Sequence, residues 1–313
     1  MTPVAGARGL AVAAAVLFST GGAAIKTGAF GALQVSSTRS AIAALALLIF
    51  VQGRVRVDGS ILAAGVAYAA TLTLFVAATK LTTAANAIFL QSTAPLYLLV
   101  LGPWVLKEQF RRQDLGYVLA MAAGLIVCFL GQPAATTTAP NPPLGNLLGL
   151  ASSLTWAATL VGLRHVSRAK DGGLSAVVVG NVVAAVLTLP FAFPFPAAPP
   201  MAWLGLVYLG VVQIGLAYIC LTRSLDRLPA LEVSLLLLLE PVLNPVWTWL
   251  VRGERPGAWV LAGGTLILAA SSWRATTGVW GQTGVRPGSD RGQTGVRPGS
   301  DQGQTPPGRP ESG

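Results

Sequence analysis

An ionisable side chain stands inside an otherwise apolar stretch of this sequence. Glu240 follows five consecutive leucines, at 235–239, and is followed by Pro241. A charged group costs about 2.5 to 3.5 kcal/mol at the centre of an apolar membrane helix, so Glu240 needs a partner or a function. Pro241 removes a backbone hydrogen bond and predicts a kink. Asn244 lies four residues beyond Glu240 and therefore shares its helix face.

A carboxyl group and an amide on one side of a kinked helix are typical of a polar cavity lining. In this interpretation Glu240 binds a proton or a cation. In the alternative, its carboxyl group hydrogen-bonds a neighbouring helix and only holds the helices together. The residues themselves leave both interpretations open.

Other polar and aromatic residues within apolar segments are candidates for contact with a small ligand. Arg39 could clamp a carboxylate or pair with an acid from another helix, and its alternative is to extend to the membrane interface. Trp156, near the middle of its segment, could form an aromatic wall, because a lipid-facing tryptophan more often lies at a helix end. Asn181 and Gln213 offer hydrogen bonds, with helix packing as the alternative for each.

The sequence lacks the residues that a metal centre or an enzyme needs. Its single histidine, His165, stands beside arginines in a basic connection, and both cysteines, Cys128 and Cys220, lie in apolar segments. We therefore predict no metal site, no cofactor and no enzymatic activity. The formal net charge is +10, but no basic face with interleaved aromatic residues is present, which excludes nucleic acid as a partner.

Membrane helices must position these residues. The chain has 313 residues, of which 53% are hydrophobic and 10% charged, too apolar for a water-soluble domain. A crossing helix needs about 20 apolar residues. The first apolar segment could instead be a signal peptide, but we treat it as a helix. We predict ten transmembrane helices, at roughly 9–26, 37–52, 59–79, 84–106, 115–132, 144–163, 174–193, 201–222, 230–251 and 256–273.

Lysine and arginine residues set the predicted orientation. With the N-terminus inside, the cytoplasmic segments hold eleven of them before the C-terminal tail, and the opposite side holds four. Because cytoplasmic loops are enriched in these residues, both termini are expected in the cytoplasm. Residues 274–313 contain a direct repeat, at 281–291 and 292–302, and cannot bury a core, so we expect a disordered cytoplasmic tail.

The two halves of the chain contain matching segments. Residues 84–108 align with residues 230–254 at a constant offset of 146, so that Pro95 meets Pro241. Each half holds five predicted crossings, and an odd number of crossings inverts the second copy in the membrane. Such inverted repeats can open a central site to one face and then to the other.

The repeat defines the predicted fold. We expect an all-α integral membrane protein of ten transmembrane helices, with one five-helix repeat in residues 1–132 and an inverted copy in residues 144–273. The offset also pairs Glu108 with Glu254, each at a helix end beside a basic residue. We expect both glutamates to order the loops through ion pairs.

The halves differ in their polar groups. The offset places an alanine, Ala94, where the second half has Glu240. Gln91 and Tyr97 lie three residues on either side of Ala94, close to its helix face, and could offer neutral hydrogen bonds to a ligand. Packing against the next helix is the alternative for both.

These features together resemble the EamA-like family of the drug/metabolite transporter superfamily. The resemblance rests on the paired proline-to-glutamate spacing, on LLEPVLNPVWTWLVRGERP at 238–256, and on the arginine in SSTRSAIAALALL at 36–48. It covers residues 9–273. The second half carries the family's Gly-Glu pair at Gly253 and Glu254, whereas the first half has Lys107 before Glu108.

The resemblance implies a multi-pass protein of the bacterial inner membrane in a family made up mostly of exporters of amino acids and other small metabolites. We predict a secondary transporter that works by alternating access and is coupled to protons. Its expected partners are a small-molecule substrate and membrane lipid, and a homodimer is left open. A channel or a membrane receptor or scaffold is the alternative, although no repeated pore motif is present.

Overall fold

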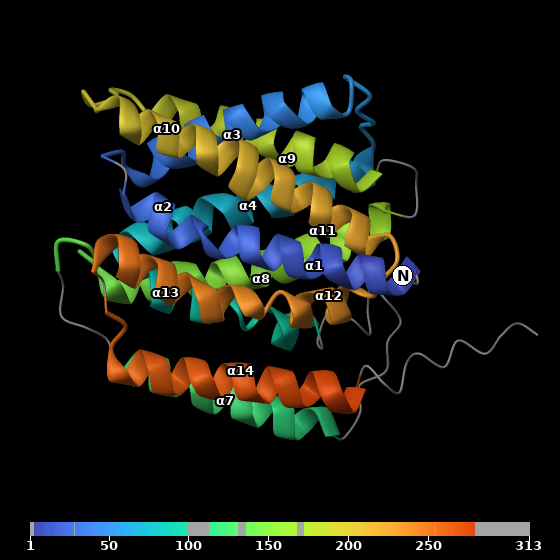
Figure 1. Ribbon diagram of the computed structural model, residues 1–313, viewed down its shortest axis with the longest axis vertical. Coiled ribbons are helices and arrows are strands. Elements are labelled where there is room, and N and C mark those ends of the chain that lie inside the picture. Colours follow the sequence, from blue (N-terminus) through green and yellow to red (C-terminus); the bar gives the residue numbers. More distant parts are fainter. Residues whose placement is uncertain are drawn as a thin grey trace, which may run out of the picture.

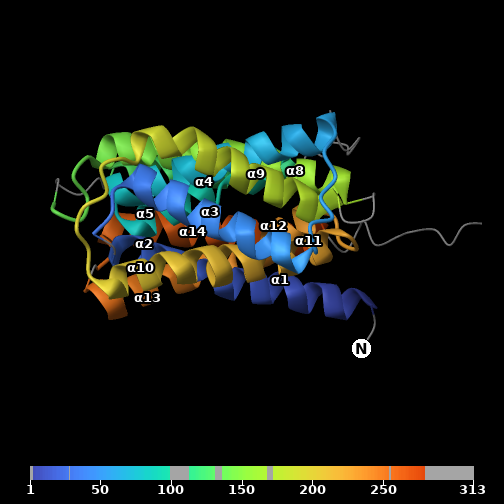
Figure 2. The same ribbon diagram turned by 90° about the horizontal axis from the view of Figure 1, so that it is seen from above.

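The computed structural model describes residues 3–27, 29–98, 113–130, 136–167, 172–253 and 255–278. Within these ranges the regular structure is helical, apart from one isolated bridge between Thr136 and Ala139. The helices lie side by side with nearly parallel axes (Figure 1; Figure 2). The end of this bundle that carries the N-terminus is called the amino end below, and the opposite end is called the far end.

The described helices follow the predicted segments closely. Those of the first half are α1 (Pro3–Ser19), α2 (Gly21–Thr27), α3 (Ala32–Phe50), α4 (Gly59–Leu81), α5 (Ala84–Gln91) and α7 (Gln113–Leu130). Those of the second half are α8 (Pro142–Val166), α9 (Gly172–Thr188), η1 (Leu189–Phe191), α10 (Pro200–Tyr208), η2 (Leu209–Leu216), α11 (Ala217–Leu225), α12 (Ala230–Leu236), α13 (Leu239–Arg252) and α14 (Ala258–Gly278). Of these, η1 is a 3₁₀ turn and η2 is a π-helical segment.

The described helices are long and apolar enough to cross a membrane in seven places, and a shorter apolar helix covers Ala258–Ala270. Side chains on outward faces are apolar, as with Ile49 at 70% exposure and Leu250 at 65%. The chain is therefore an all-helical membrane protein. The count of ten crossings and the inverted pairing of the halves stay predictions.

Side-chain caps fix several helix ends. The Asp58 carboxylate accepts hydrogen bonds from the amides of Ser60 and Ile61, at 2.9 and 3.0 Å, at the start of α4. Thr83 caps α5 in the same way. Helix α13 ends at Gly253, whose φ of 65° is left-handed and favours glycine.

Helix α3 begins five residues before the predicted start at residue 37. The amide of Gly31 donates to the Gln34 side chain at 2.8 Å, and Gln34 in turn donates to the carbonyl of Ala192 at 3.0 Å. The polar residues at the start of this segment are therefore part of a docked helix end.

Helices are interrupted where the two proline residues of the repeat predict it. In one crossing the turn at Leu237–Leu238 separates α12 from α13, just before Pro241. The matching turn at Ser92–Thr93 ends α5, just before Pro95. Because proline has no amide hydrogen, the local amides bond three residues back, as Glu240 does to the Leu237 carbonyl at 2.9 Å.

Two further helix irregularities have no proline beside them in the sequence. Thr20 separates α1 from α2, and η2 forms the middle of the crossing that contains Gln213. π-Helical segments inside α-helices occur frequently at functional sites.

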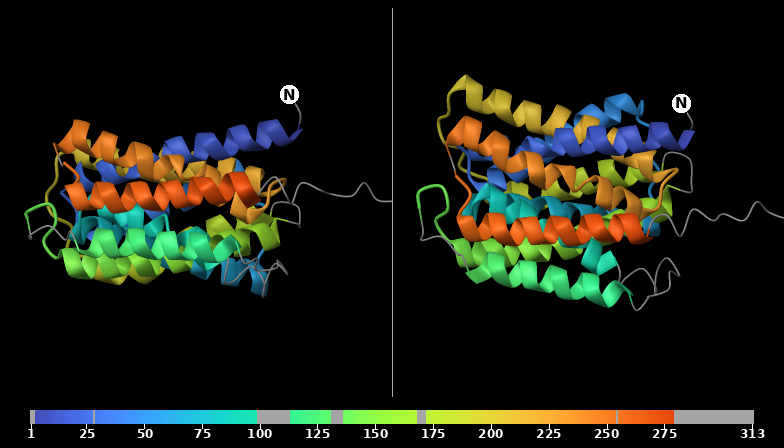
Figure 3. Two further views of the ribbon diagram at one scale, coloured as in Figure 1. Left: turned by 90° about the horizontal axis from the view of Figure 1, so that it is seen from below. Right: turned by 60° about the horizontal axis from the view of Figure 1, so that its bottom comes forward.

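Helices of the two halves pack against each other throughout the bundle. Helix α4 contacts α8 and α9, α3 contacts α9, and α1 contacts α11. The fit between α4 and α9 is close, because a Cβ atom at Gly180 would lie 2.4 Å from Cδ1 of Tyr68. Helices α7 and α14 pair with each other along one side of the bundle (Figure 1; Figure 3).

The two ends of the bundle are joined by different polar contacts. At the amino end, Arg8 Nε of α1 lies 2.8 Å from Glu232 Oε1 of α12. At the far end, Asn86 of α5 donates to Asn146 of α8, which also accepts from the Thr82 hydroxyl at 2.8 Å. An ionic contact thus joins the halves at one end and a neutral one at the other.

Candidate functional site

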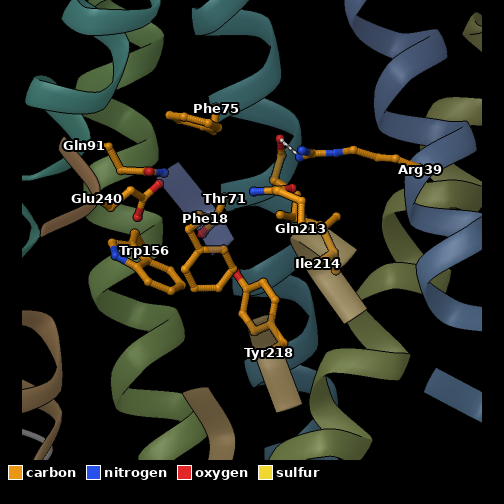
Figure 4. Close-up of a pocket in the computed structure, with 11 residues that line it drawn as sticks. Phe18, Arg39, Thr71, Phe75, Gln91, Trp156, Gln213, Ile214, Tyr218 and Glu240 are labelled. Carbon is orange, nitrogen blue, oxygen red and sulfur yellow. Dashed lines mark hydrogen bonds between the residues drawn. The ribbon is translucent and has the colours of Figure 1, made fainter. Parts of the chain in front are cut away.

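A cavity of about 400 Å³ lies between the interrupted helices. Side chains from α1, α3, α4, α5, α8, η2, α11 and α13 line it (Figure 4). Its walls are formed by Phe18, Arg39, Thr71, Leu72, Phe75, Gln91, Trp156, Gln213, Ile214, Tyr218 and Glu240. Five of the eight predicted ligand-binding residues are among them, namely Arg39, Gln91, Trp156, Gln213 and Glu240.

Arg39 is the cation of this cavity. Its side chain is 1% exposed, and Nη2 donates to the carbonyl of Leu72 on α4 at 3.2 Å. Its Nε has no hydrogen-bond partner among the described residues. The alternative prediction, that Arg39 extends to the membrane interface, is therefore wrong. Helix α3 begins at Ala32, so Arg39 lies about two turns inside the helix and is buried there.

Glu240 is the anion of the cavity. It is the second residue of α13, directly after the helix interruption, and its side chain is partly exposed to the cavity. Among the described residues, no basic side chain forms an ion pair with it. In Figure 4 Glu240 and Arg39 lie on opposite sides of the cavity.

Three aromatic rings form one wall. Phe18 and Tyr218 meet edge to face, with ring centroids 4.9 Å apart, and Trp156 lies 6.4 Å from Phe18. Phe75 lies on the other side of the cavity (Figure 4). The sequence predicted only Trp156 of this wall, because a phenylalanine or tyrosine in an apolar helix is indistinguishable from a packing residue.

Two glutamines bring neutral polar groups to the cavity. Gln91 Nε2 donates to the Ser152 hydroxyl at 2.6 Å, which orients the amide. Gln213 comes from η2 and is 6% exposed, and its Oε1 has no partner among the described residues. A buried acceptor without a partner is unfavourable, so the Gln213 oxygen is suited to a ligand donor.

Three other predicted residues lie away from the cavity. Asn244 is fully buried against α2, where a Cβ atom at Gly22 would lie 2.4 Å from its Oδ1. Asn181 donates to the Tyr68 hydroxyl at 2.8 Å. Tyr97 packs against the hydrophobic core. These side chains support the walls instead of lining the cavity.

The residues predicted to be structural divide in two. Pro95 and Pro241 line a smaller adjoining cavity of about 290 Å³, which shares Gln91, Trp156 and Glu240 with the main one. Glu108 and Glu254 lie outside the described residues, as does the repeat tail from residue 279. The ion pairs expected of these two glutamates stay predictions.

The arrangement brings one positive and one negative side chain to the same cavity. A guanidinium is suited to a carboxylate and a carboxylate to an ammonium group, and the aromatic wall between them offers apolar surface.

Comparison with known proteins gives three findings. A family model described as "EamA-like transporter family" matches residues 7–130 and 143–273. A protein of Archaeoglobus fulgidus described as "Uncharacterized transporter" is 27% identical over 266 residues, which cover 84% of this chain and 94% of that protein. A solved structure described as "Crystal structure of protein" superposes with a TM-score of 0.64 at 20% identity, over 87% of this chain and 96% of that chain. The last similarity shows a shared fold.

Proposed function

Because the chain belongs to the EamA-like transporter family, we propose that it is a secondary transporter that exports an amino acid or a related small metabolite by alternating access. The observation that carries this proposal is the placement of Arg39 and Glu240 on opposite sides of one central cavity (Figure 4). A zwitterion would present its carboxylate to Arg39 and its ammonium group to Glu240.

Interrupted helices support the choice of this cavity as the transport site. In secondary transporters, discontinuous helices commonly form the substrate and ion sites near the middle of the membrane. Glu240 directly follows one interruption, Gln91 directly precedes another, and Gln213 lies on η2. The polar groups of the site are therefore placed where the backbone departs from regular α-helix.

Alternating access would use two inverted halves. With the offset of 146, the turn at Ser92–Thr93 maps to residues 238–239, one residue beyond the turn at Leu237–Leu238. A second correspondence relates Lys26 to Arg164 at an offset of 164 − 26 = 138. Lys26 Nζ donates to the carbonyl of Thr82 at 2.8 Å, at the C-terminal end of α4.

Arg164 donates to the carbonyl of Leu225, at the C-terminal end of α11. The same offset of 138 relates Phe18 to Trp156, which meet in the aromatic wall. Related residues with related contacts, on α1–α2 in one half and on α8 in the other, support the inverted arrangement.

Proton coupling would act through Glu240. The carboxyl group can bind either a proton or the ammonium group of the substrate, so the two compete for one site. Protonation from the outside would release the substrate there, and loss of the proton to the cytoplasm would prepare the site for the next molecule. We place the protein in the bacterial inner membrane with both termini in the cytoplasm, so that the amino end faces the cytoplasm.

Flux in proteoliposomes tests this function. The purified full chain is reconstituted, and efflux of a panel of radiolabelled amino acids is measured with and without a pH gradient. The proposal predicts gradient-stimulated flux of at least one neutral amino acid, lost in Glu240→Gln. The variant Arg255→Gln, which removes an exposed arginine outside the cavity, should transport normally. Equal flux in wild type and Glu240→Gln would remove Glu240 from the coupling step.

A further inference from the structure

A second, more polar pocket lies at the amino end of the bundle, away from the central cavity. Its volume is about 930 Å³, and it shares no residue with the central cavity. Three chain segments form it: the end of α3 with the turn after it, the first turn of α9, and the last turn of α11. All three segments lie at the amino end (Figure 1).

Two arginines from different segments line this pocket. Arg54 follows α3 and Arg223 belongs to α11, and both side chains are exposed. Asp226 is the one acid on the wall, so the lining carries a net charge of +1, from two arginines and one aspartate. The exposed Arg56 is nearby, since its amide donates to the Ser175 hydroxyl of α9 at 3.1 Å. The pocket lining therefore carries more positive than negative side chains.

One arginine contacts an aromatic ring, and a tight turn brings the backbone of the other to the pocket. The guanidinium carbon of Arg223 lies 5.6 Å from the centre of the Phe50 ring, which stabilises the cation while leaving the N–H edge of the guanidinium accessible. After α3 the chain turns through Gln52 and Gly53, at φ values of 54° and 71°. The Gly53 amide bonds back to the Leu48 carbonyl at 2.9 Å, which closes the helix end and brings Arg54 to the pocket.

The remaining walls suit an anion with an apolar attachment. Gly173 and Leu174 belong to the first turn of α9, whose backbone amides carry partial positive charge. Phe50 is 47% exposed and Ile49, its neighbour on α3, is 70% exposed. Apolar side chains that face the bilayer thus lead directly to the mouth of a positive pocket at the level of the helix ends.

We propose that this pocket binds a phosphate group, and that the phosphate belongs to the headgroup of an anionic membrane phospholipid. Arg54 and Arg223 bind the phosphate oxygens, and the acyl chains follow Phe50 and Ile49 along α3. Guanidinium groups bind phosphate in a bidentate manner, and basic pockets between membrane helices on the cytoplasmic side bind anionic headgroups. This site is independent of the transport cavity and of its substrate.

Lipid binding to the purified full chain tests the proposal. Native mass spectrometry and thermal unfolding are recorded in detergent with added phosphatidylglycerol, with phosphatidylcholine, or with millimolar inorganic phosphate. We expect phosphatidylglycerol to be retained and to raise the unfolding temperature, and the other two additives to have little effect. In Arg54→Gln/Arg223→Gln, the affinity for phosphatidylglycerol should fall roughly thirtyfold, the contribution of two arginines near an anionic surface.

The matched control is Arg227→Gln/Arg255→Gln, which removes two exposed arginines that do not line the pocket. It should retain the lipid as the wild type does. Equal loss in both double variants, or no preference of the wild type for phosphatidylglycerol over phosphatidylcholine, would overturn the site. Stabilisation by inorganic phosphate equal to that by the lipid would overturn the assignment to a headgroup. The wild-type comparison does not depend on whether a variant folds.

Discussion

Arg8 Nε and Glu232 Oε1 lie 2.8 Å apart and connect α1 to α12 across the two halves of the chain. The side chain of Arg8 is 42% exposed, whereas that of Glu232 is 10% exposed. The far end has the neutral pair of Asn86 and Asn146 in its place. Each of these two contacts joins the halves near one end of the bundle.

The first prediction concerns this ion pair. Arg8→Gln should change the free energy of unfolding by less than about 1 kcal/mol, because a pair with one partly exposed member is screened by solvent. It should nevertheless raise the labelling of a cysteine introduced at Gln213 by a reagent added on the cytoplasmic side. Labelling in inside-out membrane vesicles with a membrane-impermeant reagent measures this, with Arg227→Gln as the control. Unchanged labelling alongside a large loss of stability would show that the pair only holds the fold together.

The second prediction concerns the support of the aromatic wall. Asn181 donates to the Tyr68 hydroxyl at 2.8 Å, and the Tyr68 ring lies 4.8 Å from that of Tyr218. Asn181→Ala removes the partner of a buried hydroxyl and should destabilise the protein by about 1 to 3 kcal/mol. Thermal or chemical unfolding in detergent measures the change.

Adding Tyr68→Phe removes the hydroxyl as well, so the double variant should be closer to wild type than the sum of the single effects. Strictly additive effects would mean that the hydrogen bond does not couple the two side chains.

The third prediction concerns the close approach of α4 and α9. A Cβ atom at Gly180 would lie 2.4 Å from Cδ1 of Tyr68 and 2.6 Å from the Gly65 carbonyl oxygen. Gly180→Ala should therefore separate the helices and cost about 1 to 3 kcal/mol. Gly205→Ala on α10 is the matched control, because no atom lies within 4 Å of its added Cβ. Its unfolding temperature should be unchanged or higher; equal behaviour of both variants would contradict the packing described.

Helix positions and the interruptions at proline could be predicted from the sequence because their causes are local. Any proline lacks an amide hydrogen, and the helix is interrupted beside Pro241. The interruption at Thr20 has no such cause. Close by, Gly22 lies against Asn244 of a distant helix, a contact that the local sequence does not indicate.

The site was predictable where a polar residue is costly in an apolar segment. Arg39, Gln213 and Glu240 stand out for this reason and line the cavity. Asn244 stood out equally, but tertiary packing turns it toward α2. Tyr218 gave no signal, because an aromatic residue on an apolar helix has the same pattern whether it faces a cavity or the core.

Ligand binding with matched analogues tests the central claim most directly. The amino acid that is transported is compared with its amide, which lacks the carboxylate, and with its N-acetyl derivative, which lacks the ammonium group. Affinities are measured for the purified wild type, Arg39→Gln and Glu240→Gln.

A cavity that holds a zwitterion between these two residues predicts specific pairings. Glu240→Gln should weaken binding of the amino acid by about tenfold to a hundredfold, the contribution of a hydrogen bond between charged groups. The already weak binding of the N-acetyl derivative should not change. Arg39→Gln should likewise weaken binding of the amino acid and leave the already weak binding of the amide unchanged. If each variant weakens the amino acid and the matching analogue by the same factor, Arg39 and Glu240 do not bind the two charges of the substrate.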